Sequence, residues 1–205
     1  METAVASCFW KSRSETADDC ANRALIFFRL LSDHGQVFRH WRKTGRSAQS
    51  AQANAVDTSH LATVHSLFQS GRLRRDLDNA AMEELGFAIG LWNGEVGSLS
   101  AKLRIHCGIA ASTTLLNSVV LHFPSPMAED QGELLGLLDN LIESWDPDFA
   151  QIYRDDQEPF LYGRTDSFAG SALYLRSGLL PPSQLPKRFG PHTRPTGTIY
   201  ASIER

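Results

Sequence analysis

Cysteine is scarce in this 205-residue chain, which contains Cys8, Cys20 and Cys107 and no other cysteine. An odd number of cysteines without a closely spaced pair forms neither a disulfide framework nor a zinc-binding pattern. Free thiols are typical of a reducing cytosol, where they pack as small apolar side chains. The N-terminal sequence also lacks the basic leader of a signal peptide. We therefore expect a cytoplasmic protein with three buried, unreactive thiols.

The chain also lacks the motifs of the common catalytic and cofactor-binding sites. It contains no Gly-x-Ser-x-Gly elbow, no phosphate-binding Gly-x4-Gly-Lys-Ser/Thr loop, no His-Glu-x-x-His and no Cys-x-x-Cys. The one long, weakly charged stretch, residues 105–128, is interrupted by Ser, Thr, Asn and two prolines, so it is a poor membrane span. These absences argue against a familiar enzyme class, against a cofactor and against a membrane protein.

The middle of the sequence contains three successive strand-like segments with turn signals between them. In 98–107, apolar and polar residues alternate with a period of two, as in a strand with one buried face. The segment 86–92 precedes it and ends at Asn93-Gly94, a dipeptide suited to a tight turn. The β-branched segment 117–123 follows it. We predict an antiparallel meander at the centre of the fold.

Other segments predict helices and further strands around this meander. Helical spacing of apolar residues, with N-caps at Thr16, at Asp57 or Thr58 and at Asp130, predicts helices over 17–32, 36–43, 59–70 and 131–145. Further strands are expected at 3–10, 149–153, 170–175 and 198–203, and a polar surface loop at 44–58. We therefore expect one α+β domain over residues 1–205, with helices packed on an antiparallel or mixed sheet.

Charge is segregated along the chain, although the net charge is only −3. Residues 11–75 contain 11 Lys and Arg against 5 Asp and Glu, whereas residues 129–158 contain 10 acidic residues and the single Arg154. Such a field can steer a partner of opposite charge, but charge runs are also common on surfaces that are merely solvated. The candidate contacts are five carboxylates that follow a predicted helix: Asp146, Asp148, Asp155, Asp156 and Glu158.

Clustered carboxylates also bind divalent metal ions, so a metal-dependent hydrolase is the alternative interpretation of this acidic segment. A hydrolytic site of that kind usually needs a nearby lysine or histidine, and the segment offers only Arg154. His60 and His65 lie five residues apart on a predicted helix, where their side chains diverge. His106 and His122 can meet across neighbouring strands, either as a metal pair or as ordinary polar neighbours. The sequence favours docking over catalysis, and no metal ligand is assigned.

A set of short motifs occurs in a characteristic order along the chain. They are Glu84-Leu85-Gly86, Trp92-Asn93-Gly94, Cys107-Gly108 followed by Asn117, Trp145-Asp146-Pro147-Asp148, and Pro181-Pro182 followed by Leu185-Pro186. In this order and spacing they resemble the immunity protein 52 family of bacterial polymorphic-toxin systems. The resemblance covers most of the chain and is strongest between residues 84 and 148.

The resemblance implies a non-enzymatic antitoxin that binds a cognate effector, delivered by a type VI or related secretion system. The expected effector is a nuclease toxin with a restriction-endonuclease-like fold. A DNA-cleaving domain needs a basic groove, which an acidic surface can occupy. We therefore expect the five carboxylates to contact the toxin, with Trp92 as an aromatic anchor if its ring is exposed. A small-ligand-binding module that uses the sheet face is a third possibility.

Overall fold

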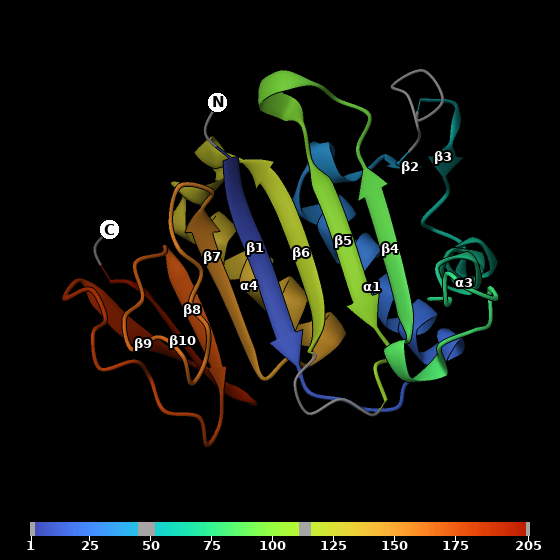
Figure 1. Cartoon of the computed structure of the whole chain (residues 1–205). Helices are drawn as coiled ribbons and strands as arrows, with labels where there is room; N and C mark the ends of the chain where they lie inside the picture. The colour runs from blue at the N-terminus through green and yellow to red at the C-terminus, as the bar shows by residue number, and fades with distance from the viewer. Residues whose placement is uncertain (1–2, 45–51, 111–115, 204–205) are drawn as a thin grey trace.

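The computed structural model describes residues 3–44, 52–110 and 116–203, so residues 45–51 of the predicted surface loop 44–58 lie outside the described residues. Within these ranges, ten strands form one antiparallel sheet in the order β3-β2-β4-β5-β6-β1-β7-β8-β10-β9 (Figure 1). The strands are β1 (Thr3–Trp10), β2 (Trp41–Lys43), β3 (Ala55–Val56), β4 (Phe87–Trp92), β5 (Lys102–Cys107), β6 (Asn117–Pro124), β7 (Phe149–Arg154), β8 (Ala172–Arg176), β9 (Phe189–Arg194) and β10 (Gly197–Ser202). The same ranges contain three α-helices: α1 (Ala17–His34), α3 (Leu61–Ser70) and α4 (Gln131–Trp145). The predicted α+β class is confirmed.

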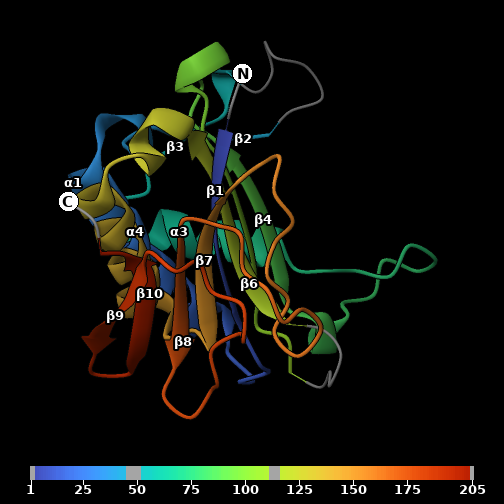
Figure 2. The ribbon, with the colours of Figure 1, turned by 90° about the vertical axis from the view of Figure 1, so that its left-hand side faces the viewer.

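Local sequence signals begin the two helices that pack on the sheet. The Thr16 hydroxyl accepts a hydrogen bond from the Asp19 amide (3.2 Å), and the Asp19 carboxylate accepts one from the Thr16 amide (2.9 Å). At the start of α4, the Asp130 side chain accepts a hydrogen bond from the Glu133 amide (3.0 Å). Figure 2 shows α1 and α4 on the same side of the sheet. The opposite side carries no α-helix in the described part of the chain.

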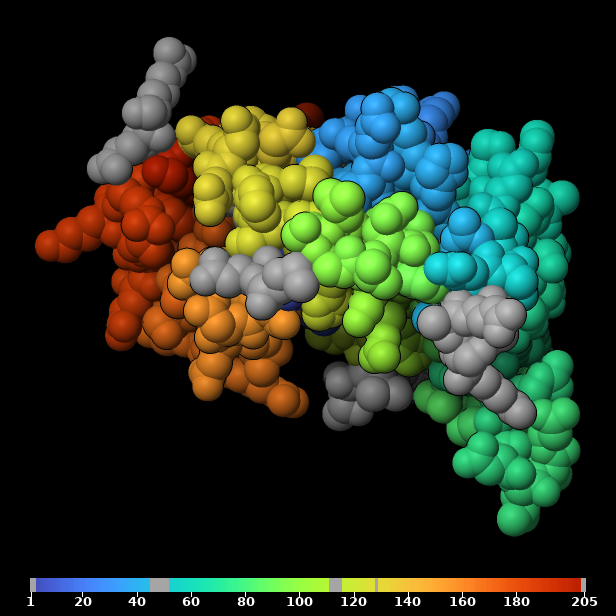
Figure 3. Space-filling view, turned by 90° about the horizontal axis from the view of Figure 1, so that it is seen from above, coloured from blue at the N-terminus to red at the C-terminus, as the bar shows by residue number. Residues whose placement is uncertain are grey.

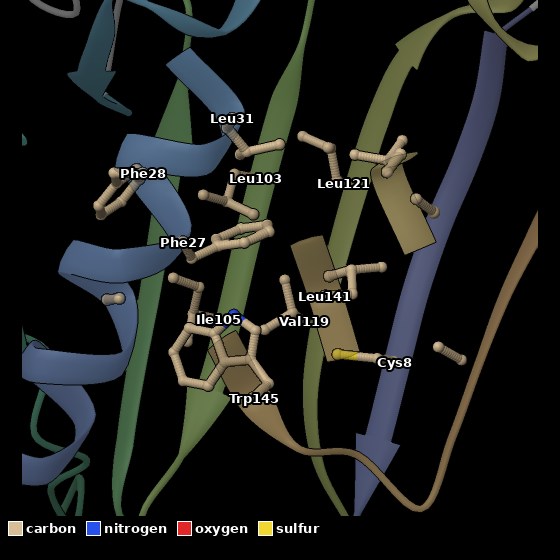
Figure 4. Close-up of a cluster of buried hydrophobic side chains, with 14 of the residues drawn as sticks. Cys8, Phe27, Phe28, Leu31, Leu103, Ile105, Val119, Leu121, Leu141 and Trp145 are labelled. Atoms are coloured by element: carbon tan, nitrogen blue, oxygen red, sulfur yellow. The ribbon is translucent and has the colours of Figure 1, made fainter. Parts of the chain in front are cut away.

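The apolar core lies between the sheet and helices α1 and α4 (Figure 4). Trp145 of α4 stacks on Trp10 of β1 with ring centroids 5.4 Å apart, and it meets Phe27 of α1 edge-on at 6.0 Å. All three side chains are fully buried. Alternate residues of the strands fill the remaining space, among them Cys8, Leu103, Ile105, Val119 and Leu121. Each large apolar side chain buried here contributes about 1.5–3 kcal/mol to stability.

The three cysteines are buried and unpaired, as the sequence predicts. Burial raises the pKa of the Cys8 thiol well above its ordinary value, because the charged thiolate is poorly solvated in the core. The same cause raises the pKa of the Cys107 thiol. Both side chains are therefore protonated at neutral pH and act as packing groups.

A second, smaller apolar cluster lies on the opposite face of the sheet, over β7 and β8. It consists of Phe149, Phe160, Phe168, Leu173 and Leu175. Two of these rings come from the connection 155–171, which joins β7 to β8. Gln151 of β7 anchors this connection, since its buried side chain accepts a hydrogen bond from the Phe160 amide (2.8 Å) and donates one to the Phe160 carbonyl (3.2 Å). The helix-free side is therefore covered at β7 and β8. We call its remaining part, formed by β4, β5 and β6, the open face.

The predicted helix 36–43 is wrong. The chain forms a short 3-10 turn at Gln36–Phe38 and then strand β2, in which Arg42 pairs with Trp92 of β4. Pairing with the sheet edge accompanies complete burial of the Trp41 side chain. Burial of a large aromatic residue outweighs the weak helical preference of the segment, which is why local pattern alone gives the wrong element.

The predicted meander is confirmed, but β6 and β1 form the middle of the sheet order. Strand β5 starts at Lys102, later than predicted, because Asn93 organises a connection longer than the expected tight turn. The buried Asn93 side chain accepts hydrogen bonds from the amides of Glu95 (3.1 Å) and Ala101 (3.0 Å). It also donates to two backbone carbonyls, so all of its polar atoms are bonded.

Strand β9 is absent from the sequence prediction, because Pro191 interrupts its pattern. Proline has no amide hydrogen, and it is tolerated here because β9 lies at the sheet edge and pairs only with β10. The N-cap of α3 is His60 rather than Asp57 or Thr58. Asp57 instead accepts hydrogen bonds from the amide (3.0 Å) and hydroxyl (2.6 Å) of Ser59, just before the helix.

Candidate functional site

The five candidate carboxylates fall into two groups rather than one patch. Asp146 and Asp148 precede β7, whereas Asp155, Asp156 and Glu158 follow it. The residues of β7 span about 20 Å at about 3.3 Å per residue, which places the groups at opposite ends of the sheet. The acidic segment of the sequence is therefore split in space.

Asp146 and Asp148 belong to an ion-pair network with two arginines. Arg176 Nη2 lies 2.6 Å from Asp146 Oδ1, and its Nε lies 3.4 Å from Asp148 Oδ1. Arg13 Nη1 lies 3.7 Å from Asp146 Oδ2 and donates a hydrogen bond to the Trp145 carbonyl (2.9 Å). Partial burial lowers the pKa of the Arg13 guanidinium, and the charge of Asp146 opposes this change. The network joins the ends of β1, α4 and β8, and its two carboxylates are compensated by two cations.

Asp155, Asp156 and Glu158 lie at the other end of the sheet, in the connection that follows β7; Figure 3 shows this end of the molecule from above. Asp155 accepts a hydrogen bond from the Thr3 hydroxyl (3.3 Å), and Arg154 Nε lies 3.2 Å from Asp156 Oδ1. Both contacts are exposed to solvent, where such bonds contribute little to stability. We call this region the acidic end. It comprises Asp155, Asp156 and Glu158, which are all exposed.

Trp92 is the last residue of β4 and is half-buried. Its indole Nε1 donates a hydrogen bond to the Glu95 carbonyl (2.8 Å). Strands β5, β6 and β1 separate β4 from β7, so Trp92 lies about 19 Å from the end of β7 at about 4.8 Å per strand. Trp92 and the acidic end therefore occupy different parts of the same end of the sheet.

The structure also places the histidines for which a metal pair was considered. Among the described residues, no group of three or more His, Cys, Asp or Glu side chains is placed to hold a metal ion. His60 and His65 each approach a different carboxylate. In the β5–β6 register, His122 faces Lys102 and His106 faces Ser118. The two histidines therefore do not meet across the strands, contrary to the possibility considered from the sequence.

A hollow of about 620 Å³ lies beside α1, on the helix-covered side of the molecule. Its apolar lining includes Leu25, Ile26 and Phe28 of α1, and polar groups include Arg29 and Asp33. A small-ligand module on the sheet face would need a cavity there with converging polar and aromatic groups. This hollow is on the other side of the sheet, so it does not serve that alternative.

Several residues that carry the family resemblance hold the fold together. Buried Asn117 accepts a hydrogen bond from the Ile109 amide (3.0 Å) and donates one to the Lys11 carbonyl (3.1 Å), which links β5, β6 and β1. Gly86 has a φ of +67°, and an added Cβ would lie 2.2 Å from a backbone oxygen of Cys107. These positions are structural, so contacts with a partner have to come from other, exposed residues.

The open face is a candidate surface that sequence reasoning missed. Lys102, Arg104 and His106 alternate with buried residues along β5 and therefore point away from the helices. The alternating pattern predicts a polar outer side of the strand, but it does not reveal that no helix covers that side. The available signal was the presence of three basic residues at successive outward positions.

No helix in the described part of the chain has the length and hydropathy needed to cross a bilayer. A search of curated proteins finds no significant match. Among solved structures, the fold is similar to that of the Pseudomonas aeruginosa T6SS protein PA0821, with a TM-score of 0.52 and 12% sequence identity. The similarity covers 98% of this chain and 65% of that protein, and at this identity it concerns the fold alone. The sequence model of immunity protein 52 matches residues 2–199, and the chain therefore belongs to the immunity protein 52 family.

Proposed function

We propose that this chain neutralises a cognate toxin in the cytoplasm by forming a tight stoichiometric complex, without a catalytic step. The observation that carries the proposal is the family match over residues 2–199. An immunity protein has to keep free toxin extremely rare, so the complex needs a dissociation constant of about 1 nM or lower, or about −12 kcal/mol.

We further propose that the toxin is a nuclease with a restriction-endonuclease-like fold, delivered by a type VI or related secretion system. A nuclease needs a basic groove to hold the phosphate backbone of DNA. The acidic end offers exposed carboxylates to such a groove, and Asp155, Asp156 and Glu158 are its proposed contacts. Trp92, at the same end of the sheet, is the proposed aromatic contact. Asp146 and Asp148 support the fold through their arginine partners.

The direct test is co-expression of this protein with the product of the adjacent gene, followed by pull-down and a DNA-cleavage assay. We expect a stable complex, and we expect that DNA cleavage by the neighbouring protein stops when the complex forms. A neighbouring protein that neither binds this chain nor cleaves DNA would refute the proposal in this form.

The acidic end can be tested by reversing Asp156 and Glu158 together to Lys. Asp155 is spared because it bonds Thr3 at the start of β1. We expect association with the toxin to slow by about tenfold at low salt, with a smaller difference at high salt. The matched control reverses Asp33 and Glu143, two exposed carboxylates on α1 and α4, to Lys. Equal association rates for both variants would remove the acidic end from the interface.

A further inference from the structure

The open face carries cations that have no carboxylate partner in the described residues. Lys102 and Arg104 are both exposed, and neither side chain forms an ion pair or a hydrogen bond with a described residue. In the register of the sheet, Lys102 lies between Trp92 of β4 and His122 of β6. Arg104 lies between Gly90 and Val120, two small or apolar neighbours that leave its guanidinium accessible.

The cations of the open face affect the pKa of His122, which lies on the same face. Partial burial lowers the pKa of His122, and Lys102 and Arg104 lower it further, while Asp155 acts in the opposite direction. The Nδ1 atom of His122 lies 4.0 Å from Asp155 Oδ1. His122 thus marks the border at which the basic open face meets the acidic end.

Two segments project from the sheet on the side of the open face. Figure 2 shows both on the side opposite α1 and α4, and Figure 3 shows them at the two sides of the molecule. One is the connection 155–171, held down by Gln151. The other is residues 72–85, which we call the arm.

The arm is a short two-stranded extension with an apolar tip. Its ladder includes hydrogen bonds from the Arg75 amide to the Ala80 carbonyl (2.9 Å) and from the Met82 amide to the Leu73 carbonyl (2.9 Å). Leu77 at the tip is 94% exposed. Leu161 in the connection 155–171 is also exposed, at 40%. Each projection therefore presents a leucine to solvent.

The open face alone is too small to form a stable protein interface. Three strands at about 4.8 Å and six residues at about 3.4 Å give a floor of about 14 by 20 Å, or about 300 Å². A stable protein complex buries about 800 Å² on each partner. The open face alone is therefore too small, and the arm and the connection 155–171 are the segments beside it that can extend the contact.

We infer that the open face, with the arm and the connection 155–171 at its sides, is the main toxin-docking surface, and that the toxin presents carboxylates to Lys102 and Arg104. This inference rests on the proposed function, which it deepens by naming the surface and the charge of the partner. A protein is favoured over a nucleic acid for two reasons. The adjoining acidic end repels phosphates, and the exposed leucines suit an apolar protein contact.

The test measures binding of the catalytically inactivated product of the adjacent gene to three variants of the full chain. Lys102→Glu with Arg104→Glu reverses the charge of the open face, and we expect at least about 100-fold weaker binding. Leu77→Asp changes a side chain exposed enough that folding is unaffected, and we expect at least about tenfold weaker binding. Arg29→Glu with Arg39→Glu makes the same charge change on the helix-covered side, and we expect binding within about twofold of the wild type.

Three outcomes would overturn the inference. If the wild type binds the toxin, and if the Lys102→Glu, Arg104→Glu variant and the Leu77→Asp variant both bind it as tightly as the wild type, the open face is not the docking surface. The proposed function then still stands. The Lys102→Glu, Arg104→Glu variant could instead keep its affinity for the toxin and lose binding to a 20-nucleotide single-stranded DNA, in which case the open face serves a nucleic acid. If it keeps that affinity and loses self-association in light scattering, the open face serves a second copy of the chain. If the wild type does not bind the adjacent product, the proposed function fails first.

Discussion

The two faces of the central sheet are built by alternate residues of the same strands, yet they differ in burial and in charge. Along β5, Leu103, Ile105 and Cys107 are buried against the helices, while Lys102 and Arg104 are exposed on the other side. The covered face contains stacked aromatic rings within the apolar core. Packing therefore constrains one face closely, and the other is free to carry the residues that recognise a partner.

Trp145→Ala is expected to have the largest effect on stability, because it removes a fully buried ring from the covered face. Loss of the stacking on Trp10, together with the cavity left behind, is expected to cost about 3–5 kcal/mol. Urea denaturation measures this loss. The comparison between the faces fails if Lys102→Ala on the open face costs as much, since that exposed change is expected to stay within about 0.5 kcal/mol.

Gln151→Ala tests what holds the connection 155–171 over the covered part of the helix-free side. It leaves the amide and carbonyl of buried Phe160 without partners, which is expected to cost about 2 kcal/mol and to loosen the connection 155–171. Hydrogen exchange of the Phe160 amide measures the loosening. The control Gln157→Ala affects a bond at the exposed end of β7, where the Gln157 side chain accepts from the Arg154 amide. Unchanged exchange in Gln151→Ala would show that other contacts hold the connection.

His122→Gln is expected to have the smallest effect and to change the pH dependence of stability. Because burial lowers the pKa of His122 below its ordinary value of 6.5, the unfolded chain takes up a proton first as the pH falls. The stability contribution is present above pH 6.5 and is lost as the pH falls below it. The variant should therefore lose less stability than the wild type between pH 7 and pH 5.5 in urea denaturation. Parallel pH profiles for both proteins would contradict this assignment.

Much of the fold could be predicted from the sequence, because it depends on local signals. The capping pair Thr16 and Asp19 starts α1 where expected, and the alternation in β5 gives the correct buried face. The errors at 36–43 and at β9 have a common cause. β9 lies at one edge of the sheet and β2 lies next to the other edge, where pairing with neighbouring strands decides the structure and local preference is weak.

The site was harder to predict, because charge that is contiguous in sequence is not contiguous in space. Asp148 and Asp155 are seven positions apart, but β7 lies between them and places them at opposite ends of the sheet. The arginines that pair with Asp146 come from distant positions, 13 and 176, which no local pattern reveals. The open face exists because the described α-helices pack on the other side of the sheet, and their placement depends on the whole topology.

The most direct measurement is a titration of the toxin's DNA-cleaving activity with wild-type protein and with the Lys102→Glu, Arg104→Glu variant. We predict that the wild type abolishes cleavage at one equivalent, with a linear fall to that point, because binding is tight and stoichiometric. We predict that an equal amount of the variant leaves most of the cleavage intact. Complete inhibition at one equivalent by both proteins would contradict the assignment of toxin docking to the open face.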